Sequence, residues 1–256
     1  MLLRPDVTPG EVDDACASAV ELGLAAVTVW PADVSRAAAA SDGSRVTVVA
    51  AVGGPSGAAP DGAAFDQSRG VFHESRGVFH RVGEALHQAR GAIRAGAGHV
   101  AVALDPDRMT GGGAADLVRE LEALCRMAHA EGVHVRAVLQ AVPVPRPEPV
   151  DGPTGAAISG LGGVGQPRVA GLPEAGRVAV EAGADLLQTG FGLRAPATAE
   201  LVRAIRRALP QRQAAIGVIA AGAEDADAAR HLLERAGADR VAVLDPAAVL
   251  RGVAVP

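Results

Sequence analysis

Three aspartates that follow predicted strands are the first candidates for chemistry. Asp105 and Asp107 stand in LDPDRM, directly after the apolar run 99–104, and Asp245 stands in LDP after the apolar run 240–244. Acids at the ends of strands in an α/β barrel can transfer protons or bind metals. The alternative is a turn or a helix cap, because Asp-Pro commonly begins a helix.

The absence of side-chain amines restricts the chemistry further. All 24 basic residues are Arg, so the chain has no Lys. Schiff-base catalysis through a side chain therefore lacks its nucleophile. The sequence also has neither the His-x-x-x-His nor the Cys-x-x-Cys spacing of common metal sites. We expect no metal and no other cofactor.

The elements that must position these residues alternate between short apolar runs and helix-like segments. The runs are apolar on both faces, as in a parallel sheet covered by helices. They span 25–30, 46–52, 99–104, 134–139, 185–190, 214–219 and 240–244. With a truncated, rudimentary first strand at Leu2-Leu3, the pattern predicts a single (β/α)8 TIM-barrel domain over residues 1–256. A Rossmann-like open sheet is the alternative.

Two segments exceed a minimal barrel, and each follows a predicted strand and precedes a helix. Residues 56–82 follow the third strand, and the Pro- and Gly-rich residues 142–171 follow the fifth strand. Such connections lie on the C-terminal face of a barrel, where active sites are built. We expect 142–171 to form a lid or an enlarged mouth, or else a tolerated insertion.

The first of these segments contains the repeat SRGVFHESRGVFH. Phe65, Phe72 and Phe79 recur every seven residues, which is two turns of α-helix. The repeat therefore predicts that the helix after the third strand is extended at its N-terminus. We expect the Phe side chains to cover the mouth as a lid, or to form an interface with a second copy of the chain in a homodimer.

The composition excludes several classes of partner. The net charge of −5 provides no basic surface for nucleic acid. No apolar run is long enough for a signal peptide or a membrane span. Cys16 and Cys125 lie far apart in the sequence, each in a helix-like segment. This spacing indicates reduced, buried thiols and not a disulfide framework. These features predict a cytoplasmic protein.

The order of the short motifs resembles that of the deoxyribose-phosphate aldolase family, class I aldolases with a TIM barrel. LLRPDVTP (2–9) is similar to that family's LLKPDAT, and LGLAAVTVWPADV (22–34) is similar to its GFAAVCVNPxxV. The motifs that follow in the same order are VTVVAAVGGPSG (46–57), AGAGHVAVALD (95–105), EAGADLLQTGFG (181–192), AAIGVIAAGAED (214–225) and AGADRVAVL (236–244). The resemblance covers nearly the whole chain apart from the two insertions, and it implies the barrel fold.

The resemblance places different side chains where the family has its catalytic residues. Gln188 stands at the Schiff-base lysine of the family's GADFVKTSTG, and Ile219 at the second lysine of its VGVKASGG. Ala101 takes the place of the catalytic Asp, and Gln140 that of a Glu. Because an amide nitrogen is not nucleophilic and a methyl group transfers no proton, these residues exclude the family's retro-aldol reaction.

The resemblance also implies changes around the phosphate site. Gly222 is retained in AGA (221–223), but Leu244 replaces a Ser beside the last strand. Arg136 replaces a further lysine of the family, and His99 replaces a Glu at the start of a strand. We expect His99 to be structural.

At the former active site, the resemblance implies a largely apolar cup. The residues expected to line it are Thr28, Trp30, Ala101, Leu104, Gln140, Gln188, Thr189, Ile219 and Leu244. Such a cup suits a neutral or aromatic small molecule better than a sugar phosphate. Gln188 and Gln140 could hold a carbonyl group in a reactive pose, with Asp105 as a further catalytic candidate. The alternative is that both amides are buried remnants.

Three functions remain compatible with these residues. The first is a repurposed enzyme that carries out a cyclisation, isomerisation or lyase reaction on an apolar or carbonyl-bearing small molecule, without a Schiff base, in specialised metabolism. The second is a non-catalytic, aldolase-like pseudoenzyme that binds a ligand or a partner. The third is a residual aldolase or lyase that uses Asp105 or water.

Overall fold

Strands and helices alternate along the chain in the computed structural model, which describes residues 2–3, 7–53, 82–104, 114–139, 171–191, 196–210 and 216–251. Each strand pairs in parallel with the next strand of the sequence, so that the order in the sheet is β1 to β7. The strands are β1 (Ala26–Val29), β2 (Thr47–Val52), β3 (His99–Leu104), β4 (His134–Leu139), β5 (Leu186–Gln188), β6 (Gly217–Ala221) and β7 (Arg240–Ala242).

The rudimentary first strand is present as a single bridge. Leu2 pairs in parallel with Val29, and its N–H donates to the carbonyl of Thr28 at 2.9 Å. Leu2 therefore lies on the side of β1 opposite β2, where the first strand of a barrel belongs. Among the described residues, no pairing between Leu2 and β7 closes the sheet.

Some helices begin where a side chain caps their free N–H groups, whereas α2 and α6 have no side-chain cap. Thr8 and Glu11 form a reciprocal capping box at the start of α1, and Asp225 caps α8. The helical segments are α1 (Pro9–Glu21), η1 (Pro31–Asp33), α2 (Val34–Ala40), α3 (Val82–Arg94), α5 (Ala114–Ala130), α6 (Leu172–Glu181), α7 (Ala199–Ala208), α8 (Ala226–Glu234) and α9 (Pro246–Arg251). Within the described ranges, no helix is long and apolar enough to cross a membrane.

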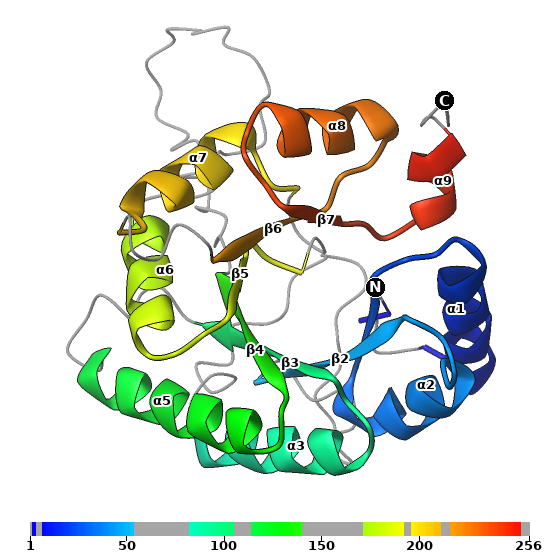
Figure 1. The fold of residues 1–256 in the computed structure, drawn as a ribbon, viewed down its shortest axis with the longest axis horizontal. Helices are drawn as coiled ribbons and strands as arrows, with labels where there is room; N and C mark the ends of the chain where they lie inside the picture. Colours follow the sequence, from blue (N-terminus) through cyan, green and yellow to red (C-terminus); the bar gives the residue numbers. More distant parts are fainter. Residues whose placement is uncertain are drawn as a thin grey trace, which may run out of the picture.

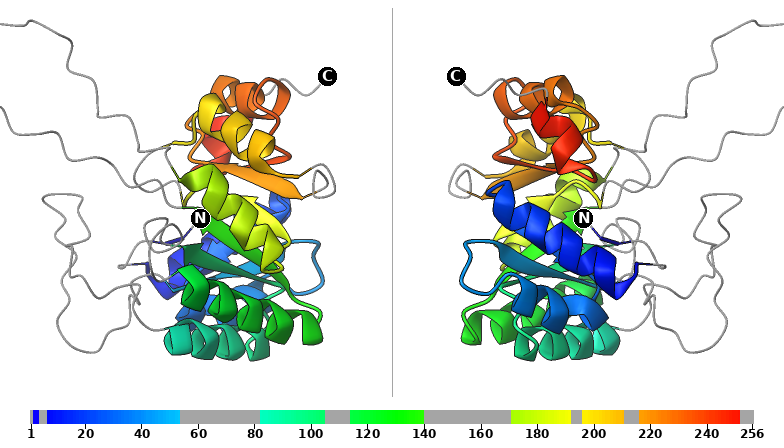
Figure 2. Two further views of the ribbon diagram at one scale, coloured as in Figure 1. Left: turned by 90° about the vertical axis from the view of Figure 1, so that its left-hand side faces the viewer. Right: turned by 90° about the vertical axis from the view of Figure 1, so that its right-hand side faces the viewer.

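The sheet curls and the helices surround it on the outside (Figure 1). Neighbouring helices pack in the pairs α1–α2, α3–α5, α6–α7 and α8–α9, and the side views of Figure 2 show them covering the outer face of the strands. This arrangement is that of a (β/α)8 barrel, as the sequence predicts. A Rossmann-like sheet would instead carry helices on both faces and reverse its strand order.

Alternate residues of each strand pack on opposite sides of the sheet. The large cluster between sheet and helices contains Val27 and Val29 of β1, and it also contains Val48, Ala50 and Val52 of β2. A second, smaller cluster fills the inner face of the curled sheet. Its buried members are Leu3, Trp30, Val49, Ala51, Ala101, Ala103, Val138 and Phe191.

Some sequence predictions differ from the structure in their bounds, and others fall outside it. The strand expected over 214–219 is β6, Gly217–Ala221, because Ala220 and Ala221 pair with β7 despite the low strand propensity of Ala. The helix extension over 66–82 lies outside the described residues except for Val82, where α3 begins. The segment 142–171 lies outside them except for Gly171. Both remain predictions.

Candidate functional site

The inner face of the sheet combines large aromatic and very small side chains. Trp30 follows β1 and is buried in the inner cluster together with Phe191, which follows β5. By contrast, β3 contributes only the methyl groups of Ala101 and Ala103 to this cluster. We call the inner-face residues Thr28, Trp30, Ala101, Gln188, Ile219 and Phe191 the interior cup; all six are buried.

Gln188 occupies the last position of β5 and is only 1% exposed. Its Cα partners are Val138 of β4 and Ile219 of β6, so that apolar side chains flank it on both sides. The Nε2 of Gln188 donates to the carbonyl of Gly190 at 2.7 Å. This hydrogen bond fixes the orientation of the amide, which presents a neutral, non-nucleophilic group at this position.

Thr189 ties β5 to β6 at the same end of the sheet. Its Oγ1 accepts the N–H of Ala221 at 3.0 Å, and its own N–H donates to the carbonyl of Ile219 at 3.0 Å. The hydroxyl therefore supports the backbone beside the cup. We assign it a structural contact with Ala221 and do not include it in the cup.

Trp30 carries a buried donor with no acceptor. Its indole Nε1 is inaccessible to solvent, and no residue of the described structure accepts a hydrogen bond from it. Leaving such an N–H unpaired costs about 1–3 kcal/mol. Such an unsatisfied donor calls for an explanation, and an ordered water or a bound polar group would complete the pairing.

The remaining residues of the predicted lining lie elsewhere or outside the described structure. Leu104 is buried in the outer cluster between sheet and helices, because it is an odd number of residues from the inward-facing Ala101. Leu244 is 48% exposed, two residues beyond the end of β7. The residues outside the described ranges are Asp105, Gln140, Phe65, Phe72 and Phe79.

Phe191 is a cup residue that the sequence motifs do not identify. It stands in TGFG (189–192), next to the position that corresponds to the family's Schiff-base motif. The signal that could have identified it is its rarity, since the chain has four Phe and the other three lie in the first insertion. In the structure it makes the cup more apolar and aromatic than the sequence motifs indicate.

The two cysteines are not available as nucleophiles. Both are buried in the outer cluster, Cys16 on α1 and Cys125 on α5. Burial raises the pKa of the Cys16 thiol, and it raises the pKa of Cys125 to about 12. Because the thiolate is the reactive form, neither residue suits covalent catalysis.

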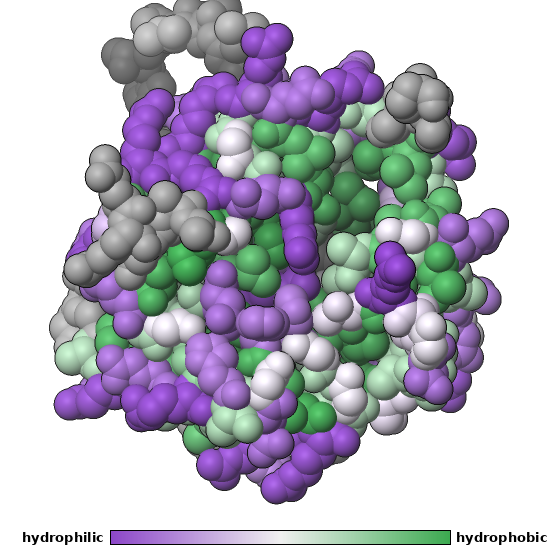
Figure 3. Space-filling view, in the orientation of Figure 1, coloured by the Kyte–Doolittle hydropathy of each residue, from purple (hydrophilic) through white to green (hydrophobic). Residues whose placement is uncertain are grey.

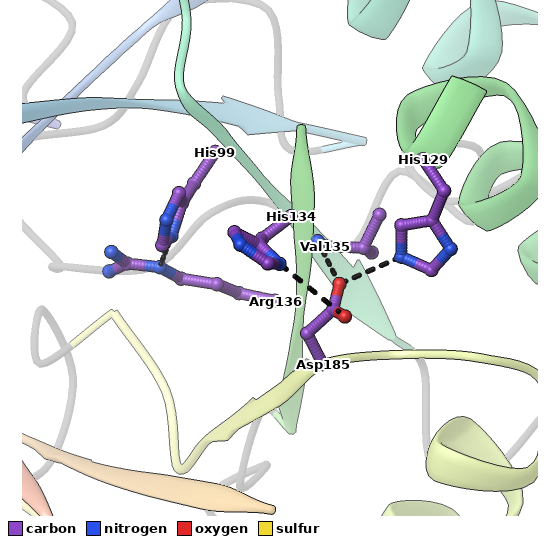
Figure 4. Close-up of polar contacts among 6 residues, drawn as sticks. All are labelled: His99, His129, His134, Val135, Arg136 and Asp185. Atoms are coloured by element: carbon purple, nitrogen blue, oxygen red, sulfur yellow. Dashed lines mark hydrogen bonds and ion pairs between the residues drawn. The ribbon is translucent and has the colours of Figure 1, made fainter. Parts of the chain in front are cut away.

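A second polar group lies where the strands begin. Arg136, the third residue of β4, points to the inner side of the sheet, and its Nε donates to Nδ1 of His99, the first residue of β3, at 3.0 Å (Figure 4). Burial and the nearby charges of Arg136, His134 and Arg240 lower the pKa of His99 to about 4. Burial and then Arg240 lower the pKa of Arg136 to about 10. His99 is therefore neutral while Arg136 is charged.

Asp185 organises the neighbouring part of this group. Its Oδ2 accepts the N–H of Val135 at 2.7 Å and lies 2.9 Å from Nε2 of His129, and its Oδ1 lies 3.5 Å from Nδ1 of His134 (Figure 4). Burial alone would raise the pKa of Asp185, but these hydrogen bonds hold it below its usual value. Both carboxylate oxygens are thus engaged by residues of β4 and α5. Among the described residues, no cluster of His, Cys, Asp and Glu is arranged to hold a metal ion.

Comparison with known proteins gives a consistent fold. No protein-family model matches the chain, and no curated protein matches it. Among solved structures, the aldolase QR15 is similar over 97% of this chain and 90% of its own, with 21% identity and a TM-score of 0.69. The deoxyribose phosphate aldolase from Aeropyrum pernix is similar over 98% of this chain and 86% of its own, with 18% identity and a TM-score of 0.67.

These structures and the order of the sequence motifs both indicate the barrel of the aldolases. The likeness extends along the whole chain and includes several deoxyribose-phosphate aldolases. The residues of the interior cup, however, contain no amine and no inward-facing carboxylate at positions 101, 188 and 219. The chain has the (β/α)8-barrel fold of these aldolases, and its sequence contains no Lys.

Proposed function

We propose that the interior cup binds an apolar, carbonyl-bearing small molecule and converts it without a Schiff base, by a cyclisation, isomerisation or lyase reaction. The observation that carries this proposal is the buried, unpartnered indole N–H of Trp30. A carbonyl oxygen is the ligand group that would accept this hydrogen bond. Phe191, which packs in the same cluster as Trp30, and the buried Ile219 of the cup favour a ligand whose remaining surface is apolar.

Positioning would supply the catalysis in this proposal. The amide of Gln188 is fixed by its bond to Gly190, so it can orient a bound carbonyl without further ordering. Holding a flexible molecule in a reactive conformation lowers the barrier of an intramolecular reaction by several kcal/mol. A cyclisation or an isomerisation needs no second substrate and gains most from such positioning.

Two alternatives lead to different observations. A non-catalytic protein would bind the ligand and release it unchanged. A residual aldolase or lyase would cleave a carbon–carbon bond with Asp105 or water as the base, and an Asp105→Asn variant would then lose activity. Analysis of the ligand before and after incubation with the protein separates these functions from the proposed one.

Binding to the cup can be measured through Trp30, because it is the only tryptophan of the chain. We expect apolar aldehydes, ketones or lactones to change its fluorescence at saturable concentrations. Ala101→Leu, which adds a bulky side chain to the cup, should weaken binding at least tenfold. Ala17→Leu makes the same change at an exposed position of α1 and should leave binding unaltered.

An unchanged affinity in Ala101→Leu would contradict the proposed place of binding. The ligand itself can be sought by mass spectrometry of the organic extract of the purified protein. A carbonyl compound of mainly apolar structure is expected. A recovered sugar phosphate would contradict the proposed ligand class.

We further expect the chain to act as a homodimer, as the Phe repeat in the first insertion suggests. The Aeropyrum pernix aldolase is described as tetrameric, so at least one barrel similar to this chain assembles from several copies. Light scattering after size-exclusion chromatography measures the mass in solution. A monomer at micromolar concentration would contradict this expectation.

A further inference from the structure

Arg136 is a buried cation on the inner face of the barrel. The residue as a whole is 5% exposed. Its Cα partners on the adjacent strands are Ala101 and Leu186, neither of which offers a hydrogen-bond acceptor from its side chain. Within the described residues, the side chain of Arg136 forms its hydrogen bond with Nδ1 of His99, which accepts from Nε.

No carboxylate compensates this charge within the described part of the chain. The acid of this polar group, Asp185, is engaged by the N–H of Val135 and by His129 and His134, and among the described residues it forms no ion pair with Arg136. Instead, the guanidinium of Arg240 adds a second positive charge near Arg136 and His99. Arg240 begins β7, pairs with the inward-facing Ile219, and contributes to the lowered pKa values of Arg136 and His99.

A buried and unpaired cation is expensive, since burying a charge costs several kcal/mol unless a counter-charge is present. The geometry also leaves hydrogen-bond donors of Arg136 and His99 that suit an anion. With Nε used by His99, both terminal nitrogens of the Arg136 fork remain for a bidentate contact. Because Nδ1 of the neutral His99 ring accepts a hydrogen bond, its proton resides on Nε2, which becomes another donor.

His99 and Arg136 lie together on one side of the sheet. In Figure 4, the side chains of His99 and Arg136 lie on the same side of β4, in the space that the strands enclose, whereas His129 approaches from α5 on the other side. Figure 3 shows polar residues gathered on this face of the molecule, with a hollow between α8 and α1. Arg240 itself is exposed at the start of β7.

We propose that the terminal guanidinium nitrogens of Arg136, assisted by the ring N–H of His99 and the charge of Arg240, bind a small oxyanion, a carboxylate or a phosphate group, at the end of the barrel where the strands begin. This oxyanion site borders the interior cup at Ala101 and Ile219, and it does not depend on the function proposed for the cup. The proposal gives a role to Arg136 and His99, which by the motif resemblance replace a lysine and a glutamate of the aldolase family.

The test is the binding of inorganic phosphate and of acetate to the whole protein, measured by calorimetry at an ionic strength held constant with sodium chloride. The wild-type protein should bind at least one of the two probes saturably at millimolar concentration. Comparing the probes identifies whether phosphate or carboxylate is preferred. The variant Arg136→Gln should bind the preferred probe at least tenfold more weakly.

Arg119→Gln is the matched control, because Arg119 is an exposed residue of α5 that pairs with Asp116, away from the proposed site. It removes the same charge and should bind as tightly as the wild type. Equal affinities of Arg136→Gln and the wild type, or no saturable binding of either probe, would overturn the proposal.

A second variant keeps the test valid if Arg136→Gln does not fold. Arg240 is exposed, so Arg240→Gln should fold and bind the probe several-fold more weakly. In the wild type, the ring-nitrogen NMR signals of His99 should shift when the probe is added, while the fluorescence of Trp30 stays constant. An unaltered affinity in Arg240→Gln together with unmoved His99 signals would equally overturn the proposal.

Discussion

The carboxylate of Asp185 accepts the backbone N–H of Val135 at 2.7 Å and thereby joins the residue before β5 to the start of β4. Val135 is completely buried, so its N–H has no access to water as a substitute. The same oxygen of Asp185 contacts His129 of α5. One side chain therefore connects two strands and a helix at the end of the barrel where the strands begin.

Replacing Asp185 with Ala should lower the free energy of unfolding by about 1–3 kcal/mol, because the buried N–H of Val135 loses its acceptor. Urea denaturation measures the change. Asp116→Ala removes an exposed carboxylate of α5 and should change the stability by less than about 0.5 kcal/mol. Equal effects of the two substitutions would show that the Asp185 contact contributes nothing specific.

His99 should make the stability depend on pH in a defined window. Its pKa in the folded protein is about 4, below the ordinary 6.5, so the unfolded chain binds the proton more readily. The contribution of the neutral ring is complete above pH 6.5 and is lost as the pH falls from 6.5 to about 4. The slope should stay below about 1.4 kcal/mol per pH unit, because the ring is partly screened by solvent.

Denaturation at a series of pH values tests this window in the variant His99→Gln, whose side chain does not titrate. Its stability should decline less between pH 6.5 and 4 than that of the wild type. His231→Gln changes an exposed histidine of α8 and should retain the wild-type slope. A wild-type slope in His99→Gln would assign the pH dependence to other groups.

No side chain of the protein should form a Schiff base. After incubation with an aldehyde and borohydride, peptide mass spectrometry should find no adduct on a side chain, because the chain has no Lys. Gln188→Lys provides the positive control, since it places an amine at the buried position. A stable adduct on any wild-type side chain would contradict the proposed Schiff-base-independent chemistry.

Thr189 should stabilise the end of β6 through its hydroxyl group. Thr189→Val removes the acceptor for the N–H of Ala221 and should cost about 1–3 kcal/mol of unfolding free energy. Thr189→Ser keeps the hydroxyl and should recover most of the loss, which thermal or urea denaturation can measure. If Ser and Val are equally destabilising, the methyl group and not the hydrogen bond is responsible.

The sequence predicts the sheet well because its strands are apolar on both faces and recur between helices. The single pairing of Leu2 with Val29 also agrees with the expected remnant of a first strand. The bounds of β6 are less predictable, since Ala220 and Ala221 become strand residues only by pairing with β7. Tertiary pairing there overrides a weak local preference.

The interior cup could be predicted in part. Gln188 and Ile219 lie side by side on the inner face, and their role in lining a binding site stays a prediction. The prediction that Leu104 lines the cup is wrong, because counting by twos from Ala101 assigns it to the outer face. The contact of Asp185 with Val135 could not be derived from spacing, because it depends on how β5 aligns with β4.

The order of strands in the sheet has a consequence for how the chain is made. Every strand pairs with the strand that precedes it in the sequence, from β1 to β7. A chain leaving the ribosome can therefore add one strand and one helix at a time to structure that has already emerged. The pairings from β1 to β7 join neighbouring units, so each can form before the last residues are made.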